Sequence, residues 1–238
     1  MDKNLALISG GGKRIGLAIS KFLLSQGYDI AVTHKTPFNG TDELSEAAAN
    51  SGRQVFYYEC DLSDLKQTEL LMEMVNSDAG PVNLLINNAS VFIKSKLRET
   101  DADLLVKTTA INYLSPYILT RDFARQCPLG QIINILDTKA IKHGFAYSAY
   151  NISKKALLEL TLQSANELAP GIRVNGICPG LILPPTGEND DYLNELAKNI
   201  PMKKKGSVDD IIGAVDFLLK SKYVTGQLLF IDGGQSIL

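Results

Sequence analysis

The sequence predicts an α/β fold of the Rossmann type, with a doubly wound parallel sheet of seven strands and helices on both faces. Short apolar runs alternate with longer amphipathic stretches from the first residues almost to the last. This alternation is typical of parallel strands joined by right-handed helical crossovers. Most of the apolar runs are continuous, as expected of strands that are buried on both faces of a sheet.

Seven apolar runs are expected to form the strands, and they are Leu5–Ser9, Ile30–Thr33, Gln54–Tyr58, Asn83–Asn87, Gln131–Leu136, Arg173–Cys178 and Gln227–Ile231. The stretches between them predict helices over Arg14–Gln26, Asp42–Asn50, Asp64–Asn76, Asp101–Arg125, Ser148–Leu168 and Val208–Leu219. The sequence has no linker rich in proline, glycine or serine and no internal repeat, so residues 1–238 are expected to form one domain.

One connection departs from this alternation of strands and helices. Residues 179–206, after the sixth strand, are too many for an ordinary turn and contain a predicted short helix, Asp191–Asn199. Long loops at the carboxyl end of a strand usually line or cover a binding site. We therefore expect a substrate loop here, the alternative being a decorative insertion.

Composition excludes several classes of protein. The 238 residues carry 24 basic and 26 acidic side chains, so the chain lacks the excess positive charge of a nucleic-acid-binding protein. Because it shows neither an apolar stretch of membrane-spanning length nor a signal-peptide pattern, we expect a cytoplasmic protein that does not bind membranes. With three widely spaced cysteines and two histidines, neither a disulfide framework nor a metal site is expected.

A glycine cluster follows the first strand and leads directly into the first helix. Its glycines are one residue too widely spaced at the end for the general G-x-G-x-x-G pattern. Glycines let the backbone approach a pyrophosphate, and a helix amino terminus offers N–H groups to an anion. The position between strand and helix favours a dinucleotide site over a plain tight turn. The cofactor contacts expected here are Gly10, Gly12, Lys13, Arg14, Ile15 and Gly16.

The end of the second strand predicts which dinucleotide is bound. It reads His34-Lys35-Thr36, and no carboxylate follows until Asp42, whereas an NAD site usually places an acidic residue there to hold the ribose 2′-hydroxyl. Lys35, together with Lys13 or Arg14, would instead hold a 2′-phosphate, because each charged hydrogen bond contributes roughly 1.5 to 3 kcal/mol. This predicts NADPH, unless Lys35 is an ordinary surface lysine.

Tyr150 and Lys154 are four residues apart on a predicted helix and so share one face of it. Alone, this pair is weak evidence for catalysis. Other polar residues are expected near it because they follow strands or lie on neighbouring helices, where open α/β sheets bind ligands. They are Asn87, Asn88, Ser90, Asn112, Asp137 and the Pro179-Gly180 pair.

Together with these residues, the glycine turn, Asp61-Leu62, Asn87-Asn88-Ala89 and the ending Asp232-Gly233-Gly234 resemble the short-chain dehydrogenase/reductase family over the whole chain. The resemblance implies that Tyr150 is the acid/base residue. It further implies that Lys154 lowers the pKa of Tyr150 and holds the nicotinamide ribose, and that Asn112 supports a proton relay through water. The implied cofactor contacts are completed by Asp61, Leu62, Asn87, Asn88, Ala89, Ser90, Tyr150, Lys154, Pro179, Gly180 and Leu181.

Two positions depart from the commonest family pattern. Asp137 stands where the family usually has a catalytic serine, and Arg14 replaces the middle glycine of the turn. With Phe92 after Asn-Asn-Ala-Ser, they resemble the pteridine reductase branch, which includes bacterial dihydromonapterin and dihydrofolate reductases. Reduction of a dihydropterin adds hydride to C6 and a proton to N5. A protonated aspartate delivers that proton more readily than a serine hydroxyl does, although Asp137 could instead be a helix-capping or salt-bridged carboxylate.

The substrate is expected to lie against Phe92, whose ring offers a face to a flat pterin opposite the nicotinamide. Ser90 would hydrogen-bond the pterin or a cofactor phosphate, and the loop from Leu181 to Met202 would shape the pocket. The alternatives are that Phe92 only anchors its loop and that Ser90 is a turn residue. The expected substrate contacts are Ser90, Phe92, Asp137, Tyr150 and Leu181.

These features predict an NADPH-dependent reductase of a dihydropterin or folate-type substrate. One alternative is an NADPH-dependent carbonyl reductase of a 3-oxoacyl carrier, sugar or steroid, which a serine at position 137 would have favoured. Another is a non-catalytic NADP-sensing regulator, which has no need of both Tyr150 and Lys154. By resemblance, the helices Asp101–Arg125 and Ser148–Leu168 pair across a two-fold axis in a homodimer or homotetramer.

Overall fold

A seven-stranded parallel sheet forms the centre of the computed structural model, which describes residues 4–36, 41–185 and 187–238. Residue 186, within the expected substrate loop, lies outside the described residues. The strand order is β3-β2-β1-β4-β5-β6-β7. The strands are β1 (Leu5–Ile8), β2 (Asp29–His34), β3 (Val55–Glu59), β4 (Leu84–Asn87), β5 (Gly130–Ile135), β6 (Ile172–Pro179) and β7 (Leu228–Ile231). Each expected strand is present, and only its ends differ.

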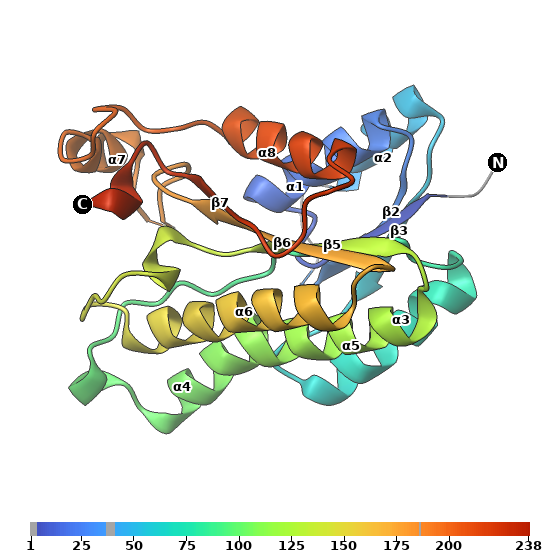
Figure 1. Ribbon diagram of the computed structural model, residues 1–238, viewed down its shortest axis with the longest axis horizontal. Coiled ribbons are helices and arrows are strands. Elements are labelled where there is room, and N and C mark those ends of the chain that lie inside the picture. The colour runs from blue at the N-terminus through green and yellow to red at the C-terminus, as the bar shows by residue number, and fades with distance from the viewer. Residues whose placement is uncertain (1–3, 37–40, 186) are drawn as a thin grey trace.

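Helices cover both faces of this sheet (Figure 1). One layer consists of α1 (Arg14–Ser25), α2 (Thr41–Ser51) and α8 (Val208–Lys220). The opposite layer consists of α3 (Leu65–Asp78), α4 (Ala102–Thr109), α5 (Ser115–Gln126) and α6 (Ser148–Glu167). The doubly wound α/β architecture expected from the sequence is therefore confirmed.

The alternation of side chains along each strand gives the two layers separate cores. Ile8 on β1 packs in a cluster with Ile19 and Ile211, whereas its neighbour Leu7 points the other way and packs in a cluster with Phe123. Truncating a buried phenylalanine such as Phe123 to alanine typically costs about 3 to 5 kcal/mol of folding free energy. These cores hold the strands rigidly and so fix where each strand ends.

The strand order reverses between β1 and β4. From this junction, β2 and β3 extend the sheet beyond β1, and β5, β6 and β7 extend it beyond β4. At such a switch point the connections leave on opposite sides of the sheet and open a crevice beyond the carboxyl ends of the strands. The glycine turn after β1 and the segment after β4 border this crevice. The fold thus places two of the expected site segments side by side.

The expected helix over Asp101–Arg125 is interrupted in the structure. A π-helical turn, Ala110–Leu114, separates α4 from α5, and such turns occur frequently at functional sites. The short helix in the long loop is α7 (Asp190–Ala197). Over the ranges that the structure describes, no helix has the length and apolar character needed to cross a membrane.

Candidate active site

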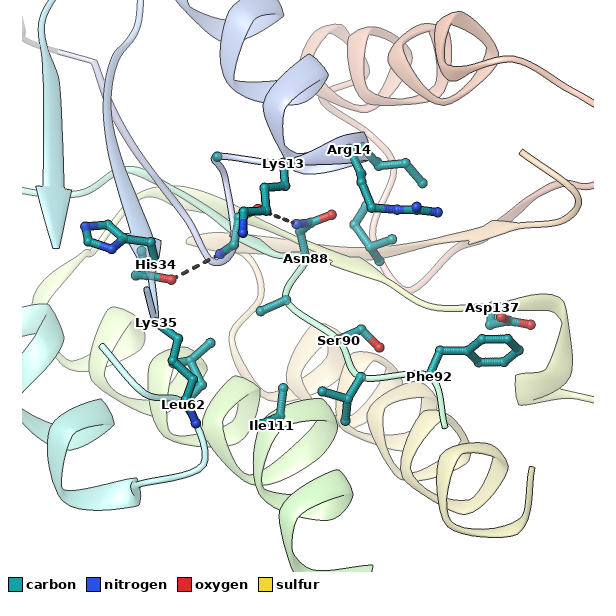
Figure 2. Close-up of a pocket in the computed structure, with 18 of the residues that line it drawn as sticks. Lys13, Arg14, His34, Lys35, Leu62, Asn88, Ser90, Phe92, Ile111 and Asp137 are labelled. Atoms are coloured by element: carbon teal, nitrogen blue, oxygen red, sulfur yellow. Dashed lines mark hydrogen bonds between the residues drawn. The ribbon is translucent and has the colours of Figure 1, made fainter. Parts of the chain in front are cut away.

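A cavity of about 640 Å³ opens at the carboxyl ends of the central strands. Figure 2 shows His34 and Lys35 at one end of it and Phe92 and Asp137 at the other. Most of the residues expected from the sequence line this cavity: Gly10, Gly12, Lys13, Arg14, Ile15, Gly16, His34, Lys35, Thr36, Asp61, Leu62, Asn88, Ala89, Ser90, Phe92, Asp137, Tyr150, Lys154 and Pro179. Residues as far apart in the chain as Gly10 and Pro179 are thereby brought into one site.

Leu183 and Pro185 also line the cavity and belong to the loop expected to shape it. Further lining residues were not selected from the sequence: Thr33, Cys60, Val91, Ile111, Ile135 and Leu136. Most are apolar neighbours of a selected residue and carry no chemical signature of their own. Thr33, Cys60, Ile135 and Leu136 lie at strand ends, and this position is the signal that could have indicated them.

The glycine turn is held in a shape that favours glycine at two positions. Gly10 has a φ of 63°, in the left-handed region. A Cβ on Gly16 would lie 2.3 Å from the carbonyl oxygen of Gly10, so any side chain there would displace the turn. The Asn88 amide donates to the carbonyl oxygens of Ser9 (3.0 Å) and Gly10 (3.2 Å), and thus ties the turn to the end of β4.

Arg14 begins α1 directly after this turn and does not point where the sequence led us to expect. Its guanidinium Nη2 donates to the carbonyl oxygen of Pro184 over 2.6 Å. Figure 2 shows the side chain directed away from His34 and Lys35. In this structure Arg14 therefore does not join Lys35 in a common phosphate site.

Lys35, at the end of β2, pairs with a carboxylate instead. Its ammonium lies 2.5 Å from Oδ2 of Asp61, which follows β3. Burial alone would raise the pKa of Asp61, but the hydrogen bonds from Lys35 and Ser63 outweigh it and lower the pKa to about 2. Asp61 therefore stays ionised throughout the physiological range, and both members of the pair face the cavity.

Tyr150 and Asp137 meet at the opposite end of the cavity. The phenol of Tyr150 donates to Oδ2 of Asp137 over 2.7 Å, and the other carboxylate oxygen accepts from the backbone N–H of Lys139 over 2.7 Å. Asp137 also caps a 3-10 turn, Thr138–Ala140. One of its oxygens therefore has the helix-capping role that we considered as the alternative to catalysis. The other oxygen, Oδ2, contacts the Tyr150 hydroxyl and can exchange a proton with it.

The pKa of Tyr150 is raised in this structure, the opposite direction to the one expected from Lys154. Burial raises the pKa of Tyr150 well above its usual value of 10, the charge and hydrogen bond of Asp137 raise it further, and a hydrogen bond with Ser90 acts in the opposite direction. Tyr150 is therefore a phenol at neutral pH. The main physical reason is burial, which disfavours the charged phenolate, and the adjacent Asp137 carboxylate adds to it.

Lys154 lies one helical turn after Tyr150, with only 1% of its surface exposed. Its ammonium donates to the carbonyl oxygen of Ile135 over 2.7 Å and lies 5.9 Å from the centre of the Tyr150 ring. Burial lowers the pKa of Lys154 to about 8, although Asp137 and Cys178 favour the charged form. The hydrogen bond to the Ile135 carbonyl, at the end of β5, thus holds the ammonium at the cavity.

Asn112, in the π-helical turn, lies behind the cavity and does not line it. Its Oδ1 accepts from the backbone N–H of Val91 (2.9 Å) and from Ser90 Oγ (3.2 Å), and its Nδ2 donates to the Val91 carbonyl (3.1 Å) and to Ser153 Oγ (3.0 Å). The side chain is fully buried. It holds the segment that carries Ser90 and Phe92 against α6, which differs from the expected relay role.

Phe92 forms a pair of stacked rings with Tyr147. The ring centres lie 4.2 Å apart at an angle of 12°, while Tyr150 meets Phe92 edge-on at 4.7 Å and 79°. The ammonium of Lys139 lies 5.1 Å from the centre of the Phe92 ring. Tyr147 has no lysine four positions later and so carries no acid/base motif, and its packing role is apparent only from the fold.

Three expected contacts do not line the cavity. Asn87 is buried in the sheet, where its Nδ2 donates to Oδ1 of Asn134 over 2.8 Å across β4 and β5. Gly180 extends the pairing of β6, since its N–H donates to the Ile231 carbonyl. The backbone carbonyl of Leu181 accepts from the Gly206 N–H, closing the base of the loop, and Leu183 faces the cavity instead.

A family model described as "Enoyl-(Acyl carrier protein) reductase" matches residues 11–236 of this chain, nearly its whole length. The chain belongs to the short-chain dehydrogenase/reductase family. This short-chain dehydrogenase/reductase is therefore an oxidoreductase by family, and the resemblance inferred from its motifs is confirmed.

Its relatives include proteins named for pterin and folate chemistry. The chain is 30% identical to "Dihydromonapterin reductase" of Shigella boydii serotype 4 (strain Sb227), over 97% of this chain and 96% of that protein. It is 29% identical to the solved structure of "FolM Alternative dihydrofolate reductase 1 from Brucella canis complexed with NADP", with a TM-score of 0.90 over 99% of this chain and 95% of that one. It is 33% identical to a blue fluorescent protein from a metagenomic library in complex with NADPH, with a TM-score of 0.90 over 97% of each chain.

Proposed function

We propose that this short-chain dehydrogenase/reductase is an NADPH-dependent reductase of a dihydropterin or folate-type substrate. The observation that carries the proposal is the 2.7 Å hydrogen bond from Tyr150 to Asp137, because the resemblance implies a serine at position 137 in reductases of carbonyl groups. A carboxyl group paired with a phenol suits the protonation of a ring nitrogen. The relatives named for dihydromonapterin and dihydrofolate reduction support the same substrate class.

The cavity fits a nicotinamide dinucleotide phosphate. The cap residue of α1, Lys13, makes no side-chain hydrogen bond to the first turn of that helix, so this helix end is suited to receive the pyrophosphate. Lys35 would hold the 2′-phosphate, and the Lys154 ammonium would hold the nicotinamide ribose. When bound, the reduced cofactor supplies the hydride. Relatives solved with NADP or NADPH support this choice of cofactor.

The proton comes from the Tyr150 and Asp137 pair. While Asp137 is ionised it accepts the Tyr150 hydrogen, which is then directed away from any substrate. When Asp137 becomes protonated, its O–H can donate to the Tyr150 oxygen, and this leaves the phenolic hydrogen free to turn toward the substrate nitrogen. Because burial and Asp137 keep the pKa of Tyr150 high, the phenol carries its proton until the substrate arrives.

Phe92 provides the surface on which a flat substrate would stack. Tyr147 covers one face of its ring at 4.2 Å, a separation that leaves no room for a third ring between them. A pterin would therefore lie on the other side of Phe92, toward the cavity that Phe92 lines together with Asp137 and Tyr150. Such offset-stacked contacts contribute about 0.5 to 1.5 kcal/mol beyond the area that they bury.

The experiment that tests the proposal is NADPH oxidation by the purified protein with four substrates side by side: dihydrobiopterin, dihydromonapterin, dihydrofolate and a 3-oxoacyl thioester. We expect turnover of at least one dihydropterin and much slower turnover of the thioester. Turnover of the thioester alone would contradict the proposed substrate and leave the family assignment intact.

We infer in addition that the protein forms a homodimer or homotetramer through α4, α5 and α6. These helices expose several large apolar side chains, namely Leu105, Val106, Tyr117, Ile152 and Leu162, and clustered exposed apolar surface commonly marks an interface. Light scattering of the purified protein tests this inference. A monomer at micromolar concentration would contradict it.

A further inference from the structure

Arg14 has an unusual backbone conformation for its side chain. Its φ is 54°, in the left-handed region that only glycine adopts without strain. The other non-glycine residue at positive φ in the described part of the chain, Lys203, is exposed in the long loop far from the glycine turn in sequence. An arginine kept at such a position invites a functional explanation that depends on its side chain.

The side chain joins two walls of the cavity. Arg14 and Pro184 are 170 positions apart in sequence, and the 2.6 Å hydrogen bond between them connects the phosphate-binding turn to the first part of the long loop. Leu183 and Pro185, on either side of Pro184, line the same cavity as Arg14. The contact therefore fixes the segment that forms one wall of the site.

The segment is also held by apolar packing and at the loop base, since Leu183 packs against the core cluster that contains Ile19 of α1. Leu181 is fastened to Gly206 at the base of the loop, and Ile182 is buried in the core. Neither Pro184 nor Pro185 has a backbone N–H to donate, so this stretch cannot be held by donating to a neighbouring strand. Among the residues that the structure describes, Arg14 adds a hydrogen bond to Pro184 from the glycine turn.

We propose that Arg14 is a positioning residue that fastens the segment from Leu183 to Pro185 to the phosphate-binding turn, and does not bind the cofactor 2′-phosphate. The guanidinium keeps this wall at the substrate end while the turn holds the pyrophosphate. Arg14 thereby couples the cofactor turn to the substrate site. This inference rests on the proposed function only in its choice of substrate for one of the measurements below.

Three variants separate this role from phosphate binding. Arg14→Met removes the guanidinium, Arg14→Lys keeps a cation that can reach one carbonyl, and Arg14→Gly removes the side chain together with the backbone strain, so it should fold at least as well as the wild type. Arg53→Met, at an exposed arginine outside the cavity, is the matched control.

The first measurement is fluorescence titration with NADPH and NADH. The second is trypsin cleavage at the exposed lysines Lys198, Lys203 and Lys204, followed by mass spectrometry with and without NADPH. We expect Arg14→Met and Arg14→Gly to leave the NADPH preference unchanged and to accelerate cleavage of the loop several-fold in the presence of NADPH. Arg14→Lys should restore part of the protection.

The third measurement is the KM for the dihydropterin, which should rise by about tenfold in Arg14→Met while kcat falls less, as for the loss of one charged hydrogen bond. A lost preference for NADPH with unchanged cleavage would show that Arg14 is a phosphate ligand and overturn the proposal. Unchanged cleavage and unchanged binding would overturn it as well. Because titration and proteolysis need no substrate, they decide the matter even if no pterin is reduced.

Discussion

Tyr150, in the first turn of α6, donates its phenolic hydrogen over 2.7 Å to Oδ2 of Asp137, which follows β5 and lies 13 positions earlier in the chain. A buried phenol and a carboxylate in direct contact share one hydrogen, so the protonation state of either determines what the other can do. This pair distinguishes the site from one built on tyrosine and serine.

The pair should behave as one unit in catalysis. We expect Tyr150→Phe and Asp137→Asn each to lower the rate of single-turnover NADPH oxidation by about 10² to 10⁴, as for the loss of general acid catalysis. The double variant should be little worse than the poorer single variant, because residues that act together have non-additive effects. Tyr147→Phe, which removes a neighbouring phenol, is the control and should retain the wild-type rate. Losses that multiply would show that the two residues act independently.

Lys154 should set the alkaline limit of activity. Because burial lowers its pKa to about 8, the ammonium is present below that pH and is lost as the pH rises through it. We expect kcat/KM to fall above about pH 8 rather than above the usual lysine value near 10.4. In Asp137→Asn the charge that favours the ammonium is gone, so the alkaline limb of the residual activity should move to lower pH. A limb that stays in place or moves upward would contradict the assignment.

Lys35 should select the cofactor, and Asp61 should weaken that selection. The two side chains lie 2.5 Å apart, so a 2′-phosphate must share Lys35 with a carboxylate that stays ionised. We expect Lys35→Met to weaken NADPH binding by about 10- to 100-fold, the loss of one charged hydrogen bond, and to leave NADH binding unchanged. Asp61→Asn should raise the ratio of NADPH to NADH affinity. Fluorescence titration measures both, with the exposed Glu59→Gln as control. A ratio that falls in Asp61→Asn would mean that Asp61 supports the phosphate site.

Tyr147 should act by supporting Phe92. The stacked pair is worth about 0.5 to 1.5 kcal/mol, so Tyr147→Ala is expected to raise the KM for a dihydropterin by about 2- to 12-fold. Tyr147→Phe keeps the ring and should change nothing, and Phe145→Ala, at an exposed ring of the same loop, is the matched control. An equal loss in Tyr147→Phe would mean that the hydroxyl, not the stacking, is what the site uses.

The strands and most of the cavity could be predicted from sequence because both depend on local signals. Continuous apolar runs such as Gln131–Leu136 have few alternatives to a buried strand, and the parallel arrangement then brings the residues that follow the strands to one edge of the sheet. Asp137 was selected by such reasoning and Phe92 by the family resemblance, and both line the cavity.

The features that the sequence did not indicate all depend on contacts between distant segments. The amphipathic pattern of Asp101–Arg125 is the same with or without a π-helical turn. The periodicity of its apolar residues therefore could not predict the interruption around Asn112. The sequence around Lys35 does not show that its ammonium pairs with Asp61. The sequence around Arg14 does not show that its guanidinium donates to the Pro184 carbonyl. Side-chain direction is decided by packing, and short motifs do not encode it.

The measurement that tests the account most directly is the ratio of kcat/KM for a dihydropterin to that for a 3-oxoacyl thioester, determined for the wild type and for Asp137→Ser. The account predicts that the wild type prefers the dihydropterin and that the substitution lowers this ratio by about 10² or more, since it removes the carboxyl group of the proton-donating pair. A ratio that is the same in both proteins, or a wild type that reduces only the thioester, would contradict it.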